Sequence, residues 1–551
     1  MITPSGAMPD DIGTIDAPSA KAVNCLKTFF GHSAFRPHQW QIVHSVLKHK
    51  RDQLVVMATG QGKSLCYQLP ALLAENGLSV VISPLISLME DQVKRLQTDG
   101  VEATFLGSAQ QDSAQVQKDL TEGCYKIVFV TPEFATGSKG FLESLADGRG
   151  VTLVAVDEAH CISQWGHDFR SSYRHLGELR RRLHSVPFLG LTATATPNVR
   201  RDIVNNLALK TPLVTVTGFD RPNLFFEVRH KTDPKTDFTH LLAPSVSGTA
   251  PHFGGPTIVY CPTKNTTNEI NALLRRMGVS SQPYHAGLSM VARRKAHTAF
   301  STDKASTIVA TVAFGMGIDK PDVRNIVHYG APKDIESYYQ EVGRAGRDGA
   351  PSKCVTFYKN GDMALYSHFV NQIDNAAFKA HKIAMGRKME EYLVTADCRR
   401  RLLLSHFEEG AVNSSVPKKD CCDNCRNTKN SDAAFGANSN SNLVDFGPEA
   451  AMLFRAVDEV FNSKTGLAKP IAFLRGSKKA ELASYSTHEL FGAGKDKSEK
   501  WWKAFAQLLR LQGYFYERKI ETQSGFPISV FGLTAKAVQI LSRNHAKPSL
   551  L

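Results

Sequence analysis

Two series of short, continuously apolar runs constrain the fold of this chain more than any other feature of its sequence. The first series lies between residues 53 and 194 and consists of QLVVMAT, LSVVISP, YKIVFVTP, VTLVAVDE and VPFLGLTAT. The second lies between residues 256 and 358 and consists of PTIVYCP, STIVAT, VRNIVHYG and SKCVTFY. Because apolar and polar residues do not alternate in these runs, they predict parallel strands buried on both faces, with amphipathic crossover helices between them. We therefore expect two tandem doubly wound α/β domains with parallel sheets, at residues 20–218 and 219–362.

The remaining segments differ from these domains in composition. Residues 1–19 are polar, so we expect them to be disordered, and residues 231–256 are rich in Pro, Gly, Ser and Thr, which predicts a loop. We expect a helical module at residues 363–428. Residues 429–447 are rich in Asn, which indicates a linker. The pattern of residues 448–545 predicts a last domain that contains helices and a hairpin.

Charge and hydropathy narrow the range of partners. The formal net charge is +14 and the pI is about 9.2, which suits a polyanion such as nucleic acid, although many basic proteins bind none. The sequence contains no run of about 18 apolar residues, so we expect no membrane partner.

A glycine-rich turn follows the first predicted strand and precedes a helical pattern, which is the setting of a phosphate-binding loop. Its glycines let backbone N–H groups approach phosphates, a lysine meets the β and γ charges, and a serine ligates Mg²⁺. Met57 stands where the full pattern has a glycine, so an ordinary strand-to-helix turn remains an alternative. The residues predicted to bind ATP in this turn are Thr59, Gly60, Gln61, Gly62, Lys63 and Ser64.

Two adjacent carboxylates, Asp157 and Glu158, end another predicted buried strand. Such a pair is costly unless a cation or a proton uses it. We expect Asp157 to hold Mg²⁺ through water and Glu158 to orient or deprotonate an attacking water. An exposed acidic turn is the alternative, but together with the glycine-rich turn the pair predicts a nucleotide hydrolase.

Four of the ten cysteines form a candidate metal site: Cys398, Cys421, Cys422 and Cys425. Four thiolates favour tetrahedral Zn²⁺ in a closed structural site, which would help a short segment to fold. Four buried, reduced cysteines are the alternative.

Motifs along most of the chain resemble those of superfamily 2 helicases, and more closely those of the RecQ family of DNA helicases. The segments that carry the resemblance are FRPHQ (35–39), SPLISLMEDQV (83–93), AVDEAHCISQWGHDFR (155–170), LTATAT (191–196), FDRPNLFFEV (219–228), YHAGLS (284–289), ATVAFGMGIDKPDVR (310–324) and QEVGRAGRDG (340–349). LRGSKKAEL and LFGAGKDKSEKWWKAFAQLL, near the C-terminus, are most similar to the Werner branch of that family.

This resemblance implies two RecA-like domains, a zinc-binding module and an RQC winged-helix domain. We expect no exonuclease and no HRDC domain, because no exonuclease-like segment precedes the core and little sequence follows residue 545. It also implies an ATP-dependent 3′–5′ DNA helicase, with ATP, Mg²⁺ and Zn²⁺ as cofactors, that acts in replication, recombination and repair. We expect tailed, forked or branched DNA as partner, together with single-strand-binding protein and repair factors, and residence in the nucleus.

The resemblance assigns further residues to the nucleotide. Gln39 is expected to pair with adenine and Arg36 to stack on the base or reach phosphate. Arg344 and Arg347 are three residues apart, which predicts one helical face, and they resemble arginines that reach the γ-phosphate from the second domain; a surface arginine pair is the alternative. We expect Gln340 to sense the same phosphate. Asp319 is expected to couple the two domains.

Candidate DNA contacts fall in two places. QWGHDFR combines two aromatic faces and a cation, Trp165, Phe169 and Arg170, which suits unpaired bases, although both rings could be core residues. In the last domain, the candidate phosphate contacts are Arg475, Ser477, Lys478 and Lys495. Phe526, near the tip of the predicted hairpin, is a candidate to stack on the terminal base pair; a buried Phe526 is the rival interpretation.

Two other functions fit parts of the sequence. The chain could be a junction-binding or strand-annealing protein whose ATPase is regulatory, or an RNA helicase, since DEAH also occurs there. The predicted winged helix and zinc module favour the DNA helicase.

Overall fold

The computed structural model describes residues 15–138, 140–166, 169–243, 251–315, 320–359, 361–408, 420–427, 445–521 and 527–543. The chain divides into two compact units, residues 1–427 and 428–551. Residues 1–14 of the segment predicted to be disordered lie outside the described residues. Its last part makes defined contacts: Ser19 caps helix α1 (Ala20–Phe30), and the carbonyl of Asp16 accepts a hydrogen bond from Trp40 Nε1 at 2.7 Å.

The first RecA-like domain is built on a seven-stranded parallel sheet with the order β3-β4-β2-β5-β6-β1-β7. Its strands are β1 (Gln53–Val56), β2 (Ser79–Ile82), β3 (Ala103–Leu106), β4 (Ile127–Val130), β5 (Leu153–Val156), β6 (Phe188–Thr192) and β7 (Leu213–Val216). Successive residues of β1 face opposite sides: Leu54 and Val56 belong to one apolar core and Val55 to another. A strand buried on both faces has no solvent side, which explains why the interior runs show no polar alternation.

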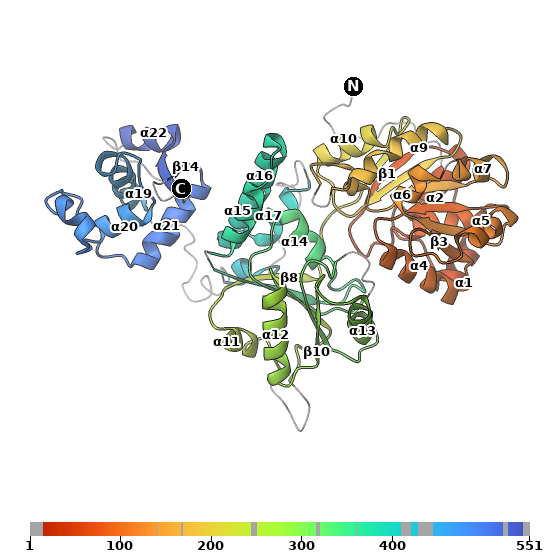
Figure 1. Cartoon of the computed structure of the whole chain (residues 1–551), viewed down its shortest axis with the longest axis horizontal. Coiled ribbons are helices and arrows are strands. Elements are labelled where there is room, and N and C mark those ends of the chain that lie inside the picture. The colour runs from red at the N-terminus through yellow and green to blue at the C-terminus, as the bar shows by residue number, and fades with distance from the viewer. Residues whose placement is uncertain are drawn as a thin grey trace. The chain divides into compact units, whose positions relative to one another are not determined.

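Helices cover both faces of this sheet (Figure 1). They are α2 (Gln39–His44), α3 (Leu65–Leu73), α4 (Ile86–Thr98), α5 (Ser113–Glu122), α6 (Pro132–Gly137), α7 (Phe141–Asp147), α8 (Ser171–Arg174), α9 (Leu176–Arg182) and α10 (Pro197–Asn206), with the π-helical turn η1 (Ser45–His49) and the 3₁₀ turn η2 (Ala159–Ile162). Several of these helices begin at residues that cap a helix N-terminus. Thr131 and Thr196 each accept a backbone N–H in front of a proline at the first helical position.

The second RecA-like domain carries a six-stranded parallel sheet with the order β10-β11-β9-β12-β13-β8. Its strands are β8 (Leu224–His230), β9 (Thr257–Tyr260), β10 (Ser281–Tyr284), β11 (Thr307–Ala310), β12 (Asn325–Tyr329) and β13 (Ser352–Tyr358). Its helices are α11 (Pro234–Thr239), α12 (Lys264–Arg276), α13 (Met290–Ser301) and α14 (Ile335–Val342). The prediction of a loop over residues 231–256 was wrong at α11, which Asp233 caps by accepting the N–H of Thr236; Asp before Pro is a helix-start signal.

Three helices follow this sheet: α15 (Met363–Asn371), α16 (Ala376–Val394) and α17 (Arg399–Ser405). The cysteine-rich segment 420–427 then packs beside β8, the edge strand. The N–H of Phe226 donates to the carbonyl of Cys421 at 3.4 Å, and the N–H of Val228 donates to Asp423 Oδ2 at 2.9 Å. The module therefore extends the edge of the second domain's sheet.

The second unit has its own apolar core. Its described elements are α19 (Gly447–Arg455), η4 (Ala456–Val460), α20 (Ala468–Leu474), η5 (Ala480–Tyr485), α21 (Glu499–Leu511), β14 (Phe515–Glu521), β15 (Pro527–Leu533) and α22 (Ala535–Arg543). Strands β14 and β15 form the predicted antiparallel hairpin. Trp502 lies fully buried at the centre of the core, where its Nε1 donates to the carbonyl of Gly494 at 2.8 Å.

Candidate functional site

The glycine-rich turn joins the carboxyl end of β1 to helix α3. Gly60 and Gly62 have φ of 80° and 83°, in the left-handed region that side chains rarely adopt. Lys63 Nζ donates to the carbonyl of Met57 at 2.9 Å, inside the curve of the turn. Burial lowers the pKa of Lys63, while the charges of Glu158 and Asp157 oppose that shift. The geometry fits a loop that wraps phosphates with one lysine beside them.

The acidic pair lies next to this loop, at the end of strand β5. Burial, together with the charge of Glu158, raises the pKa of Asp157 to about 7. Burial opposes ionisation of Glu158 as well, but its hydrogen bond to His160 and the charges of His160, Lys63 and Arg344 lower its pKa to about 2. Two buried carboxylates that compete for charge in this way fit a divalent cation, and Asp157 with Ser64 would hold it.

Arg36 and Gln39 contact the phosphate-binding loop directly. Arg36 Nη1 donates to the carbonyl of Gly60. Gln39 Nε2 donates to the carbonyl of Gly62 at 3.0 Å, and its Oε1 accepts the N–H of Arg36 at 2.8 Å. A Cβ at Gly62 would lie 2.4 Å from Gln39 Nε2 and would displace that amide, and the φ of 83° independently favours glycine there. Both side chains buttress the loop, and their contact with adenine stays a prediction.

The second domain brings its arginines to the same loop. The Cβ of Arg347 lies 3.4 Å from the position that a Cβ on Gly60 would occupy, and Arg344 is buried nearby, where its charge acts on Glu158. The expectation that they share one helical face was wrong, because α14 ends at Val342 and both arginines lie in the turns that follow. Gly346, with φ of 55°, turns the backbone between them.

An ion pair and hydrogen bonds connect Glu158 to the second domain. His160 Nδ1 lies 3.3 Å from Glu158 Oε2 and 3.0 Å from Thr192 Oγ1. Thr192 Oγ1 in turn donates to the carbonyl of Thr194 at 3.1 Å, and Gln340 Nε2 donates to Thr194 Oγ1 at 3.2 Å. Against the cost of burial, Cys161 and Glu158 raise the pKa of His160 well above its usual value. His160 therefore lies between Glu158 and Thr192, and Gln340 reaches the neighbouring Thr194 from the second domain.

Arg221 is a functional residue that the sequence predictions missed. Its Nη1 donates to the carbonyls of Thr59 at 3.0 Å and Gly343 at 3.2 Å, and its Nη2 donates to those of Ala345 at 2.8 Å and Gly346 at 2.7 Å. The guanidinium thus fastens the phosphate-binding loop to the arginine-bearing turns. The available signal was an arginine in the connector between two α/β domains, within the FDRPNL motif.

The predicted aromatic loop is partly exposed. Phe169 is 38% exposed, whereas Trp165 is half-buried and packs edge-on against His381 of α16, with ring centroids 5.4 Å apart. Arg170 Nη1 donates to the carbonyl of Pro84 at 2.6 Å. Of the two aromatic rings, that of Phe169 is therefore the more available to a base. The DNA contacts of Trp165, Phe169 and Arg170 stay predictions.

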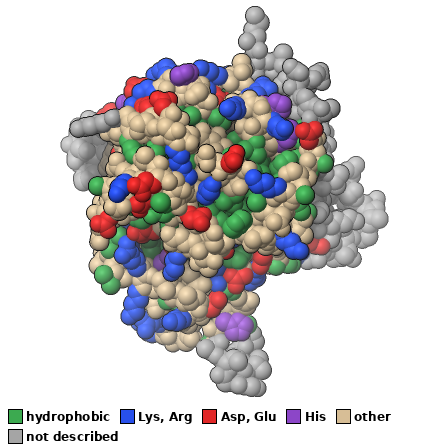
Figure 2. Space-filling model, turned by 90° about the vertical axis from the view of Figure 1, so that its right-hand side faces the viewer, with side chains coloured by type: hydrophobic (Ala, Val, Ile, Leu, Met, Phe, Trp, Pro, Cys, Tyr) green, Lys and Arg blue, Asp and Glu red, His purple; other side chains and the backbone are tan. Residues whose placement is uncertain are grey.

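A groove of about 1100 Å³ lies between α4 of the first domain and α13 of the second. The sequence predictions assigned no contacts to it, although its walls include part of the SPLISLMEDQV segment. Across the groove, Arg294 of α13 forms an ion pair with Glu90 of α4 at 3.3 Å. Its remaining charged lining includes Lys94 and Arg293. On the face shown in Figure 2, Lys and Arg side chains are interspersed with Asp and Glu.

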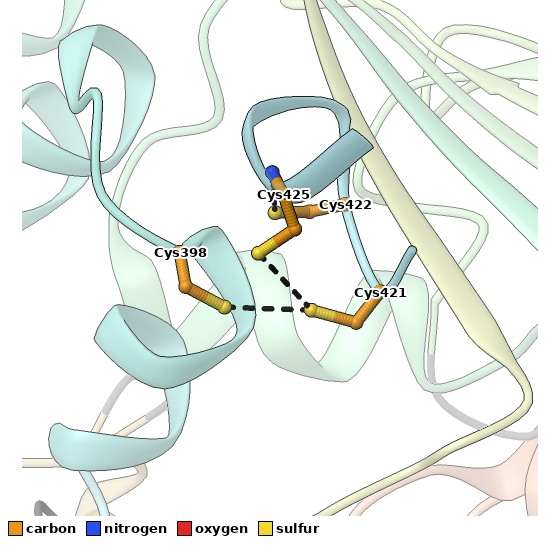
Figure 3. A group of neighbouring side chains, drawn as sticks. All are labelled: Cys398, Cys421, Cys422 and Cys425. Atoms are coloured by element: carbon orange, nitrogen blue, oxygen red, sulfur yellow. Dashed lines mark hydrogen bonds between the residues drawn. The ribbon is translucent and has the colours of Figure 1, made fainter. Parts of the chain in front are cut away.

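The four predicted metal ligands converge (Figure 3). Cys398 Sγ lies 3.4 Å from Cys421 Sγ, which lies 3.7 Å from Cys425 Sγ, and all four sulfurs are within 4.8 Å of one another. Tetrahedral Zn²⁺ with its usual Zn–S bonds separates sulfurs by ~3.8 Å, so the cluster fits that ion. Hydrogen bonds within the cluster raise the pKa of Cys421 and lower that of Cys422, and a bound cation would favour the thiolate form of all four cysteines.

One ion pair joins two parts of the metal module, and a second ties the module to the second RecA-like domain. Arg399 Nε donates to Asp423 Oδ1 at 2.6 Å, and Arg400 Nη1 donates to Asp220 Oδ1 at 2.5 Å and to the carbonyl of Arg221 at 2.7 Å. The metal module thus supports the segment that carries Arg221.

The second unit brings its predicted phosphate contacts together. The Cα of Gly492 lies 3.2 Å from the position of a Cβ on Gly476, so the LRGS and GKD segments are adjacent. Arg475, Lys478 and Lys495 are exposed, and Ser477 is half-buried. Two further predicted site residues, Asp319 and Phe526, lie outside the described residues.

Two RecA-like sheets that share a phosphate-binding loop, an acidic pair and paired arginines at their seam define the class of superfamily 2 helicases. Family models agree with this class. They match a DEAD/DEAH box helicase domain at residues 36–202, a helicase conserved C-terminal domain at 240–349, a RecQ zinc-binding domain at 360–426 and an RQC domain at 440–547.

Curated relatives narrow the class to a family. The ATP-dependent DNA helicase RecQ of Haemophilus influenzae is 38% identical over 90% of this chain and 76% of its own length. The bifunctional 3′-5′ exonuclease/ATP-dependent helicase WRN of Mus musculus is 46% identical over 97% of this chain. A protein of Acanthamoeba polyphaga mimivirus described as a candidate ATP-dependent RNA helicase is 39% identical over 95% of this chain and 92% of its own length. The chain belongs to the RecQ family of ATP-dependent DNA helicases.

The chain spans only 38% of the mouse protein's length. Among solved structures, helicase Lhr of Mycobacterium smegmatis, bound to ssDNA and AMP-PNP, superposes with a TM-score of 0.51 at 15% identity, over 93% of this chain and 77% of its own. This likeness supports the fold. Within the described ranges, no helix combines the length and apolar character that a membrane crossing requires.

Proposed function

We propose that this chain is an ATP-dependent 3′–5′ DNA helicase that moves along single-stranded DNA and separates duplex strands in replication, recombination and repair. The observation that carries the proposal is a chain of polar contacts, which runs from the Glu158–His160 ion pair through hydrogen bonds of Thr192 and Thr194 to Gln340. This chain lets the position of the catalytic carboxylate depend on the contact between two domains, which is what conversion of hydrolysis into movement requires. The 3′–5′ polarity follows from the family resemblance.

The residues of the site divide the work of hydrolysis. Lys63 and the loop N–H groups bind the phosphates, and Glu158 accepts a proton from the attacking water while His160 holds its orientation. Arg344 and Arg347 balance the charge that develops on the transferred phosphoryl group, as arginine fingers do. Ser64 and Asp157 would hold Mg²⁺, which would supply neutralisation of phosphate charge.

Contact with DNA is proposed to begin at the aromatic loop. The exposed ring of Phe169 offers a stacking surface for an unpaired base, and the loop starts close behind Glu158 in the chain. Movement of this loop would shift the acidic pair and the segment around Pro84 together. The metal module and the winged helix would bind the duplex ahead, with Arg475 and its neighbours on phosphates and Phe526 at the strand junction.

The proposal is tested by unwinding of a 3′-tailed DNA duplex with the wild-type chain and Lys63→Ala. Lys118→Ala is the matched control, because Lys118 is exposed and pairs with Glu122 of the same helix. We expect ATP-dependent unwinding by the wild type and the control, none by Lys63→Ala, and little on a 5′-tailed duplex. Equal activity on both tails would overturn the polarity.

The same assay separates the alternatives. ATP-independent annealing by both the wild type and Lys63→Ala would favour a junction-binding or annealing protein. An RNA-duplex arm is needed because the mimivirus relative is described as an RNA helicase, and a strict preference for RNA would favour that function. We also propose residence in the nucleus with single-strand-binding protein and repair factors as partners. Imaging of a fluorescent fusion tests the location, and its exclusion from the nucleus would contradict it.

A further inference from the structure

A second pocket lies on the first RecA-like domain, at the amino ends of strands β1 and β7, whereas the ATP loop lies at the carboxyl end of β1. It has a volume of about 390 Å³, and its lining includes Asp52 immediately before β1 and Leu213 at the start of β7. The phosphate-binding loop follows the carboxyl end of β1, whereas this pocket is built at its amino end. The two sites are therefore separated by the length of a strand, and the pocket is distinct from the ATP site.

The lining of this pocket is strongly basic. Lys50, Arg51, Arg180 and Lys210 contribute four cationic side chains, and three imidazoles stand among them. The only carboxylate in the described lining is Asp52. Since the chain as a whole has 66 basic and 52 acidic residues, this local excess is far above the average.

The carboxylate of Asp52 already has hydrogen-bond partners within the protein. Asp52 is buried and accepts hydrogen bonds from Arg180 Nε at 2.8 Å, from the N–H of Phe188 at 2.9 Å and from the N–H of Lys210 at 2.7 Å. The negative charge of Asp52 is therefore already balanced by Arg180 and by two backbone N–H donors. In the part of the chain that the structure describes, neither the Lys50 nor the Lys210 ammonium group has a carboxylate partner.

A buried imidazole adds a further donor. His44 is 6% exposed and its Nε2 has no hydrogen-bond partner among the described residues. The nearest carboxylate, that of Asp16, is 3.5 Å from this nitrogen and lies on a largely exposed side chain. An anion would therefore reach this nitrogen only by displacing the Asp16 side chain.

The rim of the pocket is held in an unusual backbone conformation. Lys50 and Thr211 have φ of 46° and 36°, and the neighbouring Ala208 has φ of 51°. None is glycine, so each is strained, and such residues persist where the surroundings hold them. Arg51 Nε donates to the carbonyl of Thr211 at 2.9 Å and clamps the two rim segments together. Lys50 and Lys210 are thus presented from a fixed frame.

We propose that this pocket binds a small polyphosphate anion. Its volume falls in the range of small-molecule sites, about 300–1,000 Å³, yet its walls offer cations and imidazoles where such sites are usually apolar. Pairing several unneutralised cations with one ligand requires several negative charges on that ligand. A continuous DNA strand is the less suitable occupant, because the site is a pocket and the groove that joins the two RecA-like domains lies elsewhere.

The test is equilibrium dialysis of the full chain against radiolabelled inorganic pyrophosphate at physiological salt. All proteins carry Lys63→Ala, which weakens phosphate binding at the ATP loop. The pocket variant adds Lys50→Ala and Lys210→Ala. The matched control adds Lys48→Ala and Lys118→Ala, which remove the same charge from exposed positions outside the pocket.

We expect saturable binding of one pyrophosphate per chain, weakened roughly tenfold for each pocket lysine removed and unchanged in the control. Non-saturable binding, or equal affinity in the pocket variant and the control, would overturn the proposal. Unchanged pyrophosphate binding with weaker binding of a duplex oligonucleotide would also overturn it, and would assign the lysines to nucleic acid.

Discussion

Replacement of Arg221 by alanine tests whether the connector between the domains controls hydrolysis. The guanidinium makes two contacts across the seam, to the carbonyl of Thr59 at 3.0 Å and to its Oγ1 at 3.4 Å, and three to the turns around Gly343, Ala345 and Gly346. A hydrogen bond to a charged donor contributes about 1.5–3 kcal/mol, and the freed carbonyls regain water. We therefore assign about 2–3 kcal/mol to the closed state, which corresponds to a loss of roughly 30–150-fold in kcat/KM for ATP.

The assay is single-stranded-DNA-stimulated ATP hydrolysis, with thermal unfolding measured on the same samples. Arg149→Ala is the matched control, because Arg149 also bonds several carbonyls, including Leu120 at 2.9 Å and Tyr125 at 2.6 Å, but lies wholly within the first domain. We expect both variants to unfold at lower temperature and only Arg221→Ala to lose hydrolysis. If Arg221→Ala keeps kcat/KM within threefold of the wild type, or if both variants lose it equally, the reasoning fails.

Three further predictions concern other parts of the molecule. Cys422→Ser should lower bound zinc well below one ion per chain by atomic absorption, whereas Cys261→Ser, at a buried cysteine outside the cluster, should not; equal zinc content would exclude the site. Gln340→Ala should reduce the stimulation of ATP hydrolysis by DNA about five- to tenfold, since it removes one hydrogen bond across the seam, while Thr194→Ser should retain stimulation because the hydroxyl remains. Trp502→Ala should destabilise the second unit by about 3–5 kcal/mol, seen as faster hydrogen exchange in β14 and β15, and unchanged exchange would contradict its place in the core.

The strands that could and could not be predicted differ in their place in the sheets. Every apolar run that was predicted became a strand, whereas β3, β7, β8 and β10 were missed. These four are the edge strands of the two sheets. An edge strand is covered less completely, so it needs no continuous apolar run; the burial of β7, for example, alternates along its length.

The candidate sites divide in a similar way. The phosphate-binding loop, the acidic pair and the cysteine ligands were predictable because each is a short pattern whose chemistry requires those residue types. The positions of Arg344 and Arg347 were only partly predictable. Their spacing indicated a helix, but the backbone after Val342 turns away from one, and the glycines of that segment set its path.

The sequence by itself determined two buried parallel sheets, a nucleotide loop and a set of thiolate ligands, because apolar runs and short motifs act over a few residues. Only the tertiary structure decided which distant groups meet. Arg221 bonds a carbonyl 162 positions away, and Gln340 bonds a hydroxyl 146 positions away. Such contacts exist only when two separately folded sheets approach each other, and no local pattern in the chain encodes the distance between them.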